Sequence, residues 1–88
     1  MKIEYDSKFL KQVKKLPKNQ QAKLAFLIPL LQQNPYDSKL HTKQLNPPLQ
    51  GIFSFRIDRE YRALFYFTSS DSIFLTHAKH RKDIYKNF

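Results

Sequence analysis

Apolar residues in the first part of the chain recur at helical spacing, after one short alternating segment. Residues 2–5 alternate between polar and apolar side chains, which predicts a short strand. Asp6 and Ser7 are residue types that begin helices, and apolar residues follow at positions 9, 10, 13 and 16, the spacing of one helix face. Pro17 is predicted to end this helix.

A second helix is predicted from Asn19, as its cap, to about Gln33. Its apolar residues include Ala22, Ala25, Phe26, Leu27, Leu30 and Leu31. Pro29 lies inside this segment and is expected to kink the helix or end it early, because proline lacks the backbone N–H. Residues 36–50 are polar, contain two adjacent prolines, and are predicted to form a connection with a short turn.

The pattern changes to alternation in the second half of the chain, which predicts strands. Two strands joined by a turn at residues 58–60 account for the segment 52–67. Its apolar odd-numbered positions are Phe53, Phe55, Ile57, Tyr61, Ala63, Phe65 and Phe67. Residues 69–72 are predicted to form another turn, and residues 73–78 a last strand.

The length of the first of these turns decides which residues face each other. A two-residue turn at Arg59 and Glu60 would set Arg56 opposite Ala63 and mix polar and apolar side chains on both faces. A three-residue turn over residues 58–60 sets Arg56 opposite Arg62 and gathers the odd-numbered aromatics on one face. Because a shift of one residue moves all side chains of a strand to the other face, we prefer the second register.

These elements predict an α+β fold with the order β-α-α-β-β-β in a single domain of residues 1–88. The two helices are expected to pack on one face of an antiparallel sheet. The other face is expected to stay open, with arginine side chains on it. The basic tail, residues 79–88, is compatible with a short C-terminal helix.

Positive charge is the most unusual feature of the composition. The chain has 16 Lys and Arg against 7 Asp and Glu, a formal net charge of +9 on 88 residues. This excess repels itself in the folded state and attracts polyanions, so a nucleic-acid partner is predicted ahead of an acidic protein or an anionic membrane. The absence of Cys excludes disulfides, thiol catalysis and Cys-based zinc sites.

The compartment is predicted from segments that the sequence lacks. Acidic residues at positions 4 and 6 interrupt the region where a signal peptide would be apolar. No stretch approaches the roughly 18 apolar residues that span a bilayer. We therefore expect a cytoplasmic protein with no membrane partner.

The preferred register also predicts an anion site. Like charges directly opposite each other across strands are unfavourable, so Arg56 and Arg62 either hold an anion or turn towards acidic residues and solvent. Arg81 and Tyr85 are four residues apart and would share one face of a helix. Arginine can bind a phosphate with two hydrogen bonds. Tyr85 could stack on a base, transfer a proton, or simply pack on the core.

Metal and carboxylate chemistry are not predicted. His77, His80 and Asp83 have a spacing that could bind zinc, but the neighbouring lysines and arginine would repel a divalent cation. His41 is isolated in the polar connection and is expected at the surface, and the acidic residues are scattered. A site without cofactor can still cut RNA, because the 2′-hydroxyl of the substrate is the nucleophile. The protein must orient it, assist proton transfer and neutralise the developing charge.

Three segments of the chain resemble the RelE/ParE superfamily of type II toxins. They are Tyr5–Leu16, Arg56–Tyr66 with its Tyr-Arg pair, and Ala78–Tyr85, which is similar to the His-Arg-x-x-x-Tyr endings of that superfamily. The resemblance implies a toxin that enters the ribosomal A site and cleaves messenger RNA without a metal ion, leaving a 2′,3′-cyclic phosphate. It also implies an acidic antitoxin that wraps the toxin, and contact with operator DNA only through the toxin–antitoxin complex.

The resemblance also implies roles for individual residues. Arg62 matches the strand arginine that stabilises the transition state, and Arg81 matches the basic residue of the terminal segment. Tyr85 matches the terminal aromatic residue that stacks on or activates the nucleotide. His80 and Tyr85 are the candidates for general acid and base. The predicted RNA-binding residues are Arg56, which matches a basic residue of the first hairpin strand, Lys79, Lys82 and Lys43.

Two other functions stay open at this point. Members of the ParE branch inhibit DNA gyrase and do no RNA chemistry, and some proteins of the fold could bind nucleic acid without catalysis. The presence of Arg62, Arg81 and Tyr85 favours the ribonuclease. A ribonuclease should arrest translation in a cell-free extract, whereas a gyrase inhibitor should induce DNA damage and leave translation running.

Overall fold

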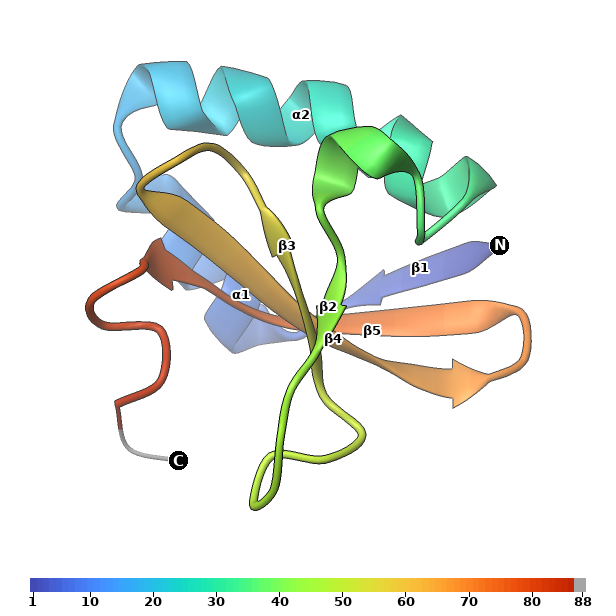
Figure 1. Cartoon of the computed structure of the whole chain (residues 1–88). Coiled ribbons are helices and arrows are strands. Elements are labelled where there is room, and N and C mark those ends of the chain that lie inside the picture. Colours follow the sequence, from blue (N-terminus) through green and yellow to red (C-terminus); the bar gives the residue numbers. More distant parts are fainter. Residues whose placement is uncertain (87–88) are drawn as a thin grey trace.

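The computed structural model describes residues 1–86 and contains one five-stranded sheet with two helices. Its strands lie in the order β1-β5-β4-β3-β2 (Figure 1). Along the chain the elements are β1 (Lys2–Tyr5), α1 (Ser7–Lys14), α2 (Lys18–Gln33), a short 3-10 helix η1 (Ser38–Leu40), β2 (Lys43–Gln44), β3 (Phe53–Arg56), β4 (Tyr61–Ser69) and β5 (Ser72–His80). The predicted α+β order is confirmed, with β2 and η1 as additions.

Strand β1 runs parallel to β5, and the other neighbouring strands are antiparallel. The short first strand therefore joins the far edge of the sheet rather than extending the hairpins. The chain reverses through α1 and α2 before it re-enters the sheet, and both helices contribute to the core on a single face. This is the predicted layer arrangement.

The core lies between the helices and the odd-numbered positions of β3 and β4. The side chains of Phe55, Ala63 and Phe65 are fully buried there. They share one cluster with Phe9 of α1 and Leu31 of α2, which are 2% and 0% exposed. The alternation in the sequence thus reports the buried face correctly.

The helix ends differ from the sequence prediction in two ways. Helix α2 begins at Lys18 rather than after an Asn19 cap, because the carbonyl of Pro17 already accepts hydrogen bonds from the N–H groups of Gln20 and Gln21, both at 3.0 Å. Of the two effects expected of Pro29, a kink or an early end, the early end does not occur. The helix continues to Gln33, and the burial of its last turn against the core outweighs one missing backbone hydrogen bond.

The tail does not form the short C-terminal helix that the sequence allowed. Residues 81–86 form successive turns, in which the carbonyl of His80 accepts from the N–H groups of Asp83 at 2.9 Å and Ile84 at 3.1 Å. So short a segment gains little from helix formation alone. Its conformation follows instead from the docking of Ile84. The last two predicted tail residues lie outside the described part of the chain.

The sheet face opposite the helices is less open than predicted. Leu64 of β4 is 0% exposed and Ile84 of the tail is 1% exposed, although both lie outside the main core cluster. Figure 1 shows the tail and the loop between β2 and β3 both projecting on the side of the sheet away from α2. The arginine-bearing face is therefore a recess between two walls rather than a bare surface.

Truncating the tail's buried side chain should destabilise the whole fold. Ile84→Ala removes a fully buried aliphatic side chain, so the free energy of unfolding should fall by about 2–4 kcal/mol. Urea denaturation followed by circular dichroism measures this change. Lys86→Ala, which alters an exposed residue of the same segment, should stay close to wild type. Equal stability of Ile84→Ala and wild type would contradict the docking of the tail.

Candidate active site

The turn between β3 and β4 has the predicted three-residue length. Arg56 lies opposite Arg62, and the N–H of Ile57 donates to the carbonyl of Tyr61 at 3.0 Å. The side chain of Asp58 shapes the turn, because its Oδ1 accepts from the N–H groups of Glu60 at 2.9 Å and Tyr61 at 3.0 Å. The predicted register is confirmed.

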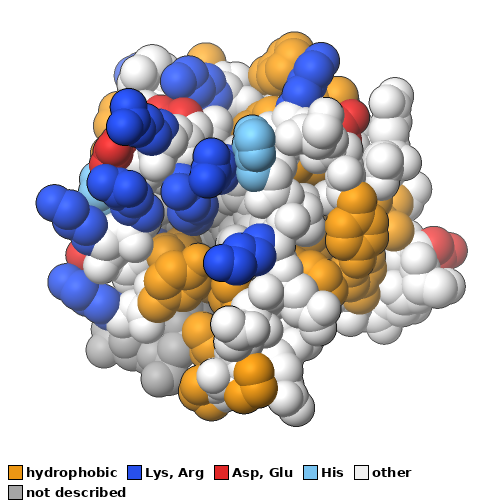
Figure 2. All heavy atoms as spheres, viewed as in Figure 1, with side chains coloured by type: hydrophobic (Ala, Val, Ile, Leu, Met, Phe, Trp, Pro, Cys, Tyr) orange, Lys and Arg blue, Asp and Glu red, His pale blue; other side chains and the backbone are white. Residues whose placement is uncertain are grey.

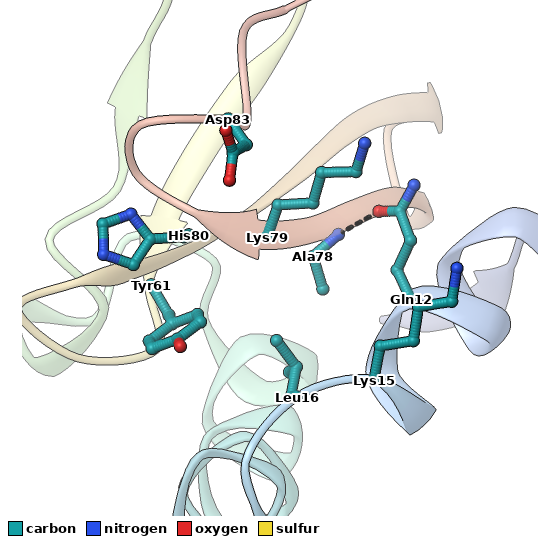
Figure 3. A pocket seen from close by; sticks show the side chains of 8 residues that line it. All are labelled: Gln12, Lys15, Leu16, Tyr61, Ala78, Lys79, His80 and Asp83. Atoms are coloured by element: carbon teal, nitrogen blue, oxygen red, sulfur yellow. Dashed lines mark hydrogen bonds between the residues drawn. The ribbon is translucent and has the colours of Figure 1, made fainter.

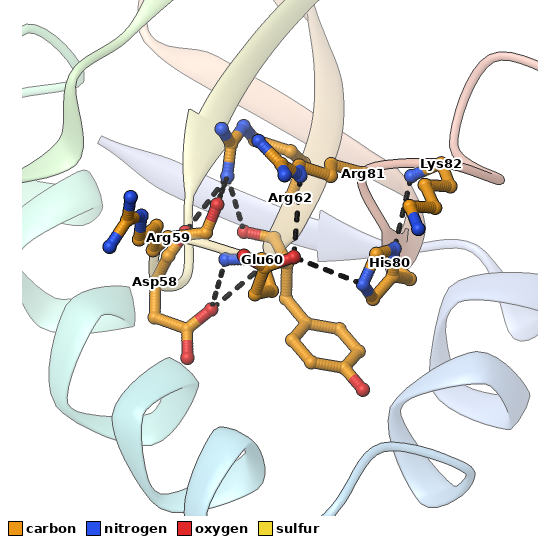
Figure 4. A network of polar contacts seen from close by, with 8 residues as sticks. Asp58, Arg59, Glu60, Arg62, His80, Arg81 and Lys82 are labelled. Carbon is orange, nitrogen blue, oxygen red and sulfur yellow. Dashed lines mark hydrogen bonds and ion pairs between the residues drawn. The ribbon is translucent and has the colours of Figure 1, made fainter.

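Arg62 is held by the backbone of this turn. Its Nη1 donates to the carbonyl oxygens of Asp58 at 2.8 Å, Arg59 at 3.0 Å and Tyr61 at 3.3 Å (Figure 4). Within residues 1–86, Nε and Nη2 make no further hydrogen bond and can reach a ligand. One edge of the guanidinium is thus fixed and the other is available.

Burial lowers the pKa of Arg62, and the positive charges of Arg56 and Arg81 lower it further. Tyr85 and Asp58 act in the opposite direction, but the net shift is downwards. Arginine nevertheless keeps its proton in proteins. The guanidinium is therefore a charge in an unfavourable environment, which an anion would improve.

The arginines converge on one cavity of about 260 Å³. Strands, tail and the end of η1 all contribute to its lining, which consists of His41, Lys43, Ser54, Arg56, Arg62, Arg81 and Tyr85. Figure 2 shows Lys and Arg side chains gathered on one part of the surface, over the β3–β4 turn and the tail. The cavity has the charge and the donors to bind a phosphate group.

Five predicted site residues meet in this cavity: Arg56, Arg62, Arg81, Tyr85 and Lys43. Tyr85 is 44% exposed, while its neighbour Ile84 is buried. Tyr85 therefore does not pack into the core. It lies at the edge of the recess, next to a second hollow beside residues 45–49.

The sequence prediction missed two residues of the lining. His41 was expected at the surface; it is exposed, but it also borders the cavity, where the chain leaves η1 in a left-handed conformation with φ of 52°. No signal in the sequence indicates this approach. Ser54 could have been found, because its even-numbered position places it on the same face of β3 as Arg56.

His80 and Lys79 do not line the arginine cavity. They line a separate cavity of about 250 Å³ beside the end of β5 (Figure 3). Its other lining residues are Gln12, Lys15, Leu16, Tyr61, Ala78 and Asp83. Lys82 is exposed and lines neither of these two cavities.

Two contacts fix the orientation of His80. Its Nδ1 accepts from the N–H of Lys82 at 3.1 Å, and its Nε2 lies 3.2 Å from Oε2 of Glu60. Nδ1 accepts in the first contact, so the proton directed at Glu60 lies on Nε2. His80 is thus a bridge between the tail and the hairpin turn, and it does not line the arginine cavity.

Two absences concern the described residues. Residues 1–86 contain no group of three or more His, Asp and Glu side chains arranged to hold a metal ion. The candidate zinc ligand His77 lies beside the hydroxyl of Thr76, and burial, followed by the charges of Lys8 and Lys79, lowers its pKa. Neither described α-helix combines the length and apolar character needed to cross a membrane.

The sequence of the chain matches one known protein family. The family model "Phage derived protein Gp49-like (DUF891)" matches residues 11–87. The chain belongs to the Gp49-like family. None of the curated proteins matches its sequence.

Solved structures similar to this Gp49-like protein are toxins and toxin–antitoxin complexes. A YoeB/ParE toxin from Agrobacterium tumefaciens is 17% identical, with a TM-score of 0.77 over 91% of this chain and 98% of that one. YafQ from E. coli is 20% identical, with a TM-score of 0.76 over 91% and 92%. The RelB-RelE antitoxin–toxin complex from Methanococcus jannaschii is 23% identical, with a TM-score of 0.77 over 97% of this chain and 98% of that one. The resemblance to the RelE/ParE superfamily is confirmed in the fold.

The turn of this Gp49-like protein should make its stability depend on pH. Burial raises the pKa of Asp58, but hydrogen bonds from Glu60, Gln20, Tyr61 and Lys23 together hold it below its usual 3.8. A carboxyl with a lowered pKa stabilises the fold above its unfolded-state pKa, and this contribution is lost as the pH falls through the folded-state value. Asp58→Asn should therefore be less stable than wild type at pH 7.

The difference between Asp58→Asn and wild type should shrink as the pH falls below 3.8. Urea unfolding between pH 7 and the acid limit of folding measures it. Asp71→Asn, in the exposed turn between β4 and β5, controls for the loss of one carboxylate. A stability difference that stays constant with pH would show that the Asp58 charge does not contribute.

Proposed function

We propose that this Gp49-like protein is the toxin of a type II toxin–antitoxin system and that it cleaves messenger RNA on the ribosome. The observation that carries the proposal is the single cavity in which Arg56, Arg62, Arg81 and Tyr85 meet. The fold supports it, because the similar solved structures are toxins or toxin–antitoxin complexes. We place this activity in the cytoplasm.

Cleavage would use the RNA's own 2′-hydroxyl as the nucleophile, with no metal ion. Attack on the adjacent phosphate adds negative charge to its oxygens in the transition state. Arg62 would donate Nε and Nη2 to these oxygens while Nη1 stays bound to the turn carbonyls. Donors that are already fixed need no reorganisation during the reaction, which is the main source of such electrostatic catalysis. Arg81 would stabilise the phosphate or the leaving group.

Proton transfer and nucleotide binding are proposed for the remaining groups around the cavity. Tyr85 is exposed at its edge and would stack on a base or transfer a proton. His41 borders the same cavity and becomes a second candidate for proton transfer. His80, which the sequence suggested for this role, is bound to Glu60 and to the backbone of Lys82, so we propose that it supports the site from outside.

The proposed partners follow from charge. An acidic antitoxin would cover the cationic face and neutralise part of the net charge of +9. The similar structures include toxins in complex with RelB and DinJ antitoxins. Messenger RNA would contact Arg56 and Lys43 in the cavity, with Lys79 and Lys82 binding flanking phosphates. Operator DNA would be bound only through the antitoxin complex.

Replacing the central arginine tests this proposal. Arg62→Ala should reduce cleavage by about 100- to 1,000-fold, the usual effect of removing one transition-state donor. The readout is the set of new message 5′ ends after induction, together with protein synthesis in a cell-free extract. Arg59→Ala is the matched control, because it removes the same charge from the same hairpin but outside the cavity.

Two outcomes would contradict this proposal. Cleavage that is unchanged in a folded Arg62→Ala variant would remove Arg62 from the mechanism. Wild-type protein that damages DNA while translation continues would indicate gyrase inhibition instead. The thermal unfolding midpoint of each variant accompanies the activity measurements.

A further inference from the structure

Glu60 joins the hairpin turn to the first residues of the tail. Its Oε2 lies 3.3 Å from Nε of Arg81 and 3.2 Å from Nε2 of His80 (Figure 4). Its backbone carbonyl also accepts a hydrogen bond from the N–H of Arg81 at 2.7 Å. The tail leaves β5 at this point, so one residue binds it through both backbone and side chain.

The contact leaves the reactive edge of Arg81 available. The side chain of Arg81 is 50% exposed, and Glu60 is the acidic group that contacts its guanidinium within residues 1–86. Because Glu60 contacts Nε, both Nη groups can point into the cavity. Arg62 is held in the same way, but through Nη1 and by backbone carbonyls. The turn therefore fixes one side of each guanidinium and leaves the other side for a phosphate.

We propose that Glu60 is a positioning residue that orders Arg81 over the cavity before the RNA arrives. The inference rests on the proposed function, because it concerns the same site. A long arginine side chain loses conformational freedom when it binds a phosphate, and ordering it in advance removes that cost from the reaction. His80 supports the arrangement, because its Nε2 contacts the same carboxylate oxygen and its Nδ1 accepts from the N–H of Lys82.

The charge of Glu60 and its positioning role have opposite effects on activity. A carboxylate beside an anion site repels RNA, so its removal should strengthen binding and speed association if charge alone matters. If Glu60 orders Arg81, its removal should slow the chemical step even though the site becomes more positive. Kinetics that separate kcat from KM therefore distinguish the two roles.

The experiment compares Glu60→Ala with Glu60→Gln on ribosomes that carry a defined message. Glu60→Ala should lower kcat on the order of tenfold, with KM unchanged or reduced, because Arg81 is displaced from its productive position. Glu60→Gln should recover part of the loss, since its amide oxygen can still accept a hydrogen bond from Nε. Glu4→Ala is the matched control: it removes an exposed carboxylate whose partner is Lys2 on β1. A kcat for Glu60→Ala at or above the wild-type value would overturn the proposal.

A second measurement does not depend on cleavage. The Nε–H resonance of Arg81 in ¹⁵N NMR spectra should exchange slowly with water in wild type and in Glu4→Ala, and rapidly in Glu60→Ala. The nitrogen shifts of His80 should show the Nε2–H tautomer in wild type. Unchanged Arg81 exchange in Glu60→Ala overturns the positioning role even if the protein is active. Rapid exchange in Glu60→Ala with no cleavage by wild type would support the geometry and reject the proposed function.

Discussion

The register of the β3–β4 hairpin is the constraint on which the rest of the structure depends. Its three-residue turn sets Arg56 opposite Arg62 on one face and places Phe55 and Ala63 in the core on the other. A shift by one residue would bury the arginines and expose the aromatics. The core thus fixes the geometry of the site. Exposing several aromatic rings would cost far more free energy than separating the two facing arginines would recover.

The same turn that sets the register also holds the reactive groups. Asp58 closes it with two backbone hydrogen bonds, and the carbonyls that the turn directs outward accept from Arg62. Glu60 extends from it to Arg81. The contacts of Asp58 and Arg62 join residues close in sequence, whereas the contact between Glu60 and Arg81 joins the hairpin to the distant tail. The site is therefore complete only when the tail has docked, which the burial of Ile84 ensures.

The sequence predicted the fold best where a periodic pattern extended over many residues. The alternation from Ile52 to Phe67 was sufficient to predict β3, β4, their register and the pairing of Arg56 with Arg62. The sequence could not reveal β2, because its two residues are exposed and have no pattern. Nor could it reveal the parallel pairing of β1 with β5, which joins segments far apart in the chain. The helical spacing of α1 and α2 was correct, but their ends were set by backbone contacts around Pro17 that no pattern shows.

The site was predicted in part for the same reason. Arg62 follows from strand alternation, which could also have indicated Ser54, whereas the positions of Arg81 and His80 depend on how the tail turns after β5. Strand β5 ends at His80 and the chain turns at Arg81, so that Arg81 lines one cavity and His80 the other. The approach of His41 depends on the path of η1 and was beyond any local signal.

The electrostatics of the site explain why its ligand should be an anion rather than another cation or an apolar group. Burial and two neighbouring arginines lower the pKa of Arg62, so the charged form is less favourable in the folded protein than in water. The fold retains that charge because three backbone carbonyl oxygens of the hairpin hold the guanidinium. A phosphate in the cavity would add the opposite charge where three guanidinium groups converge, and would bind the folded state in preference to the unfolded one. Part of the proposed interaction with RNA is thus prepared by repulsion that the folded protein already contains. The hydrogen bonds that Arg62 donates to the hairpin keep its side chain from turning away to relieve that repulsion.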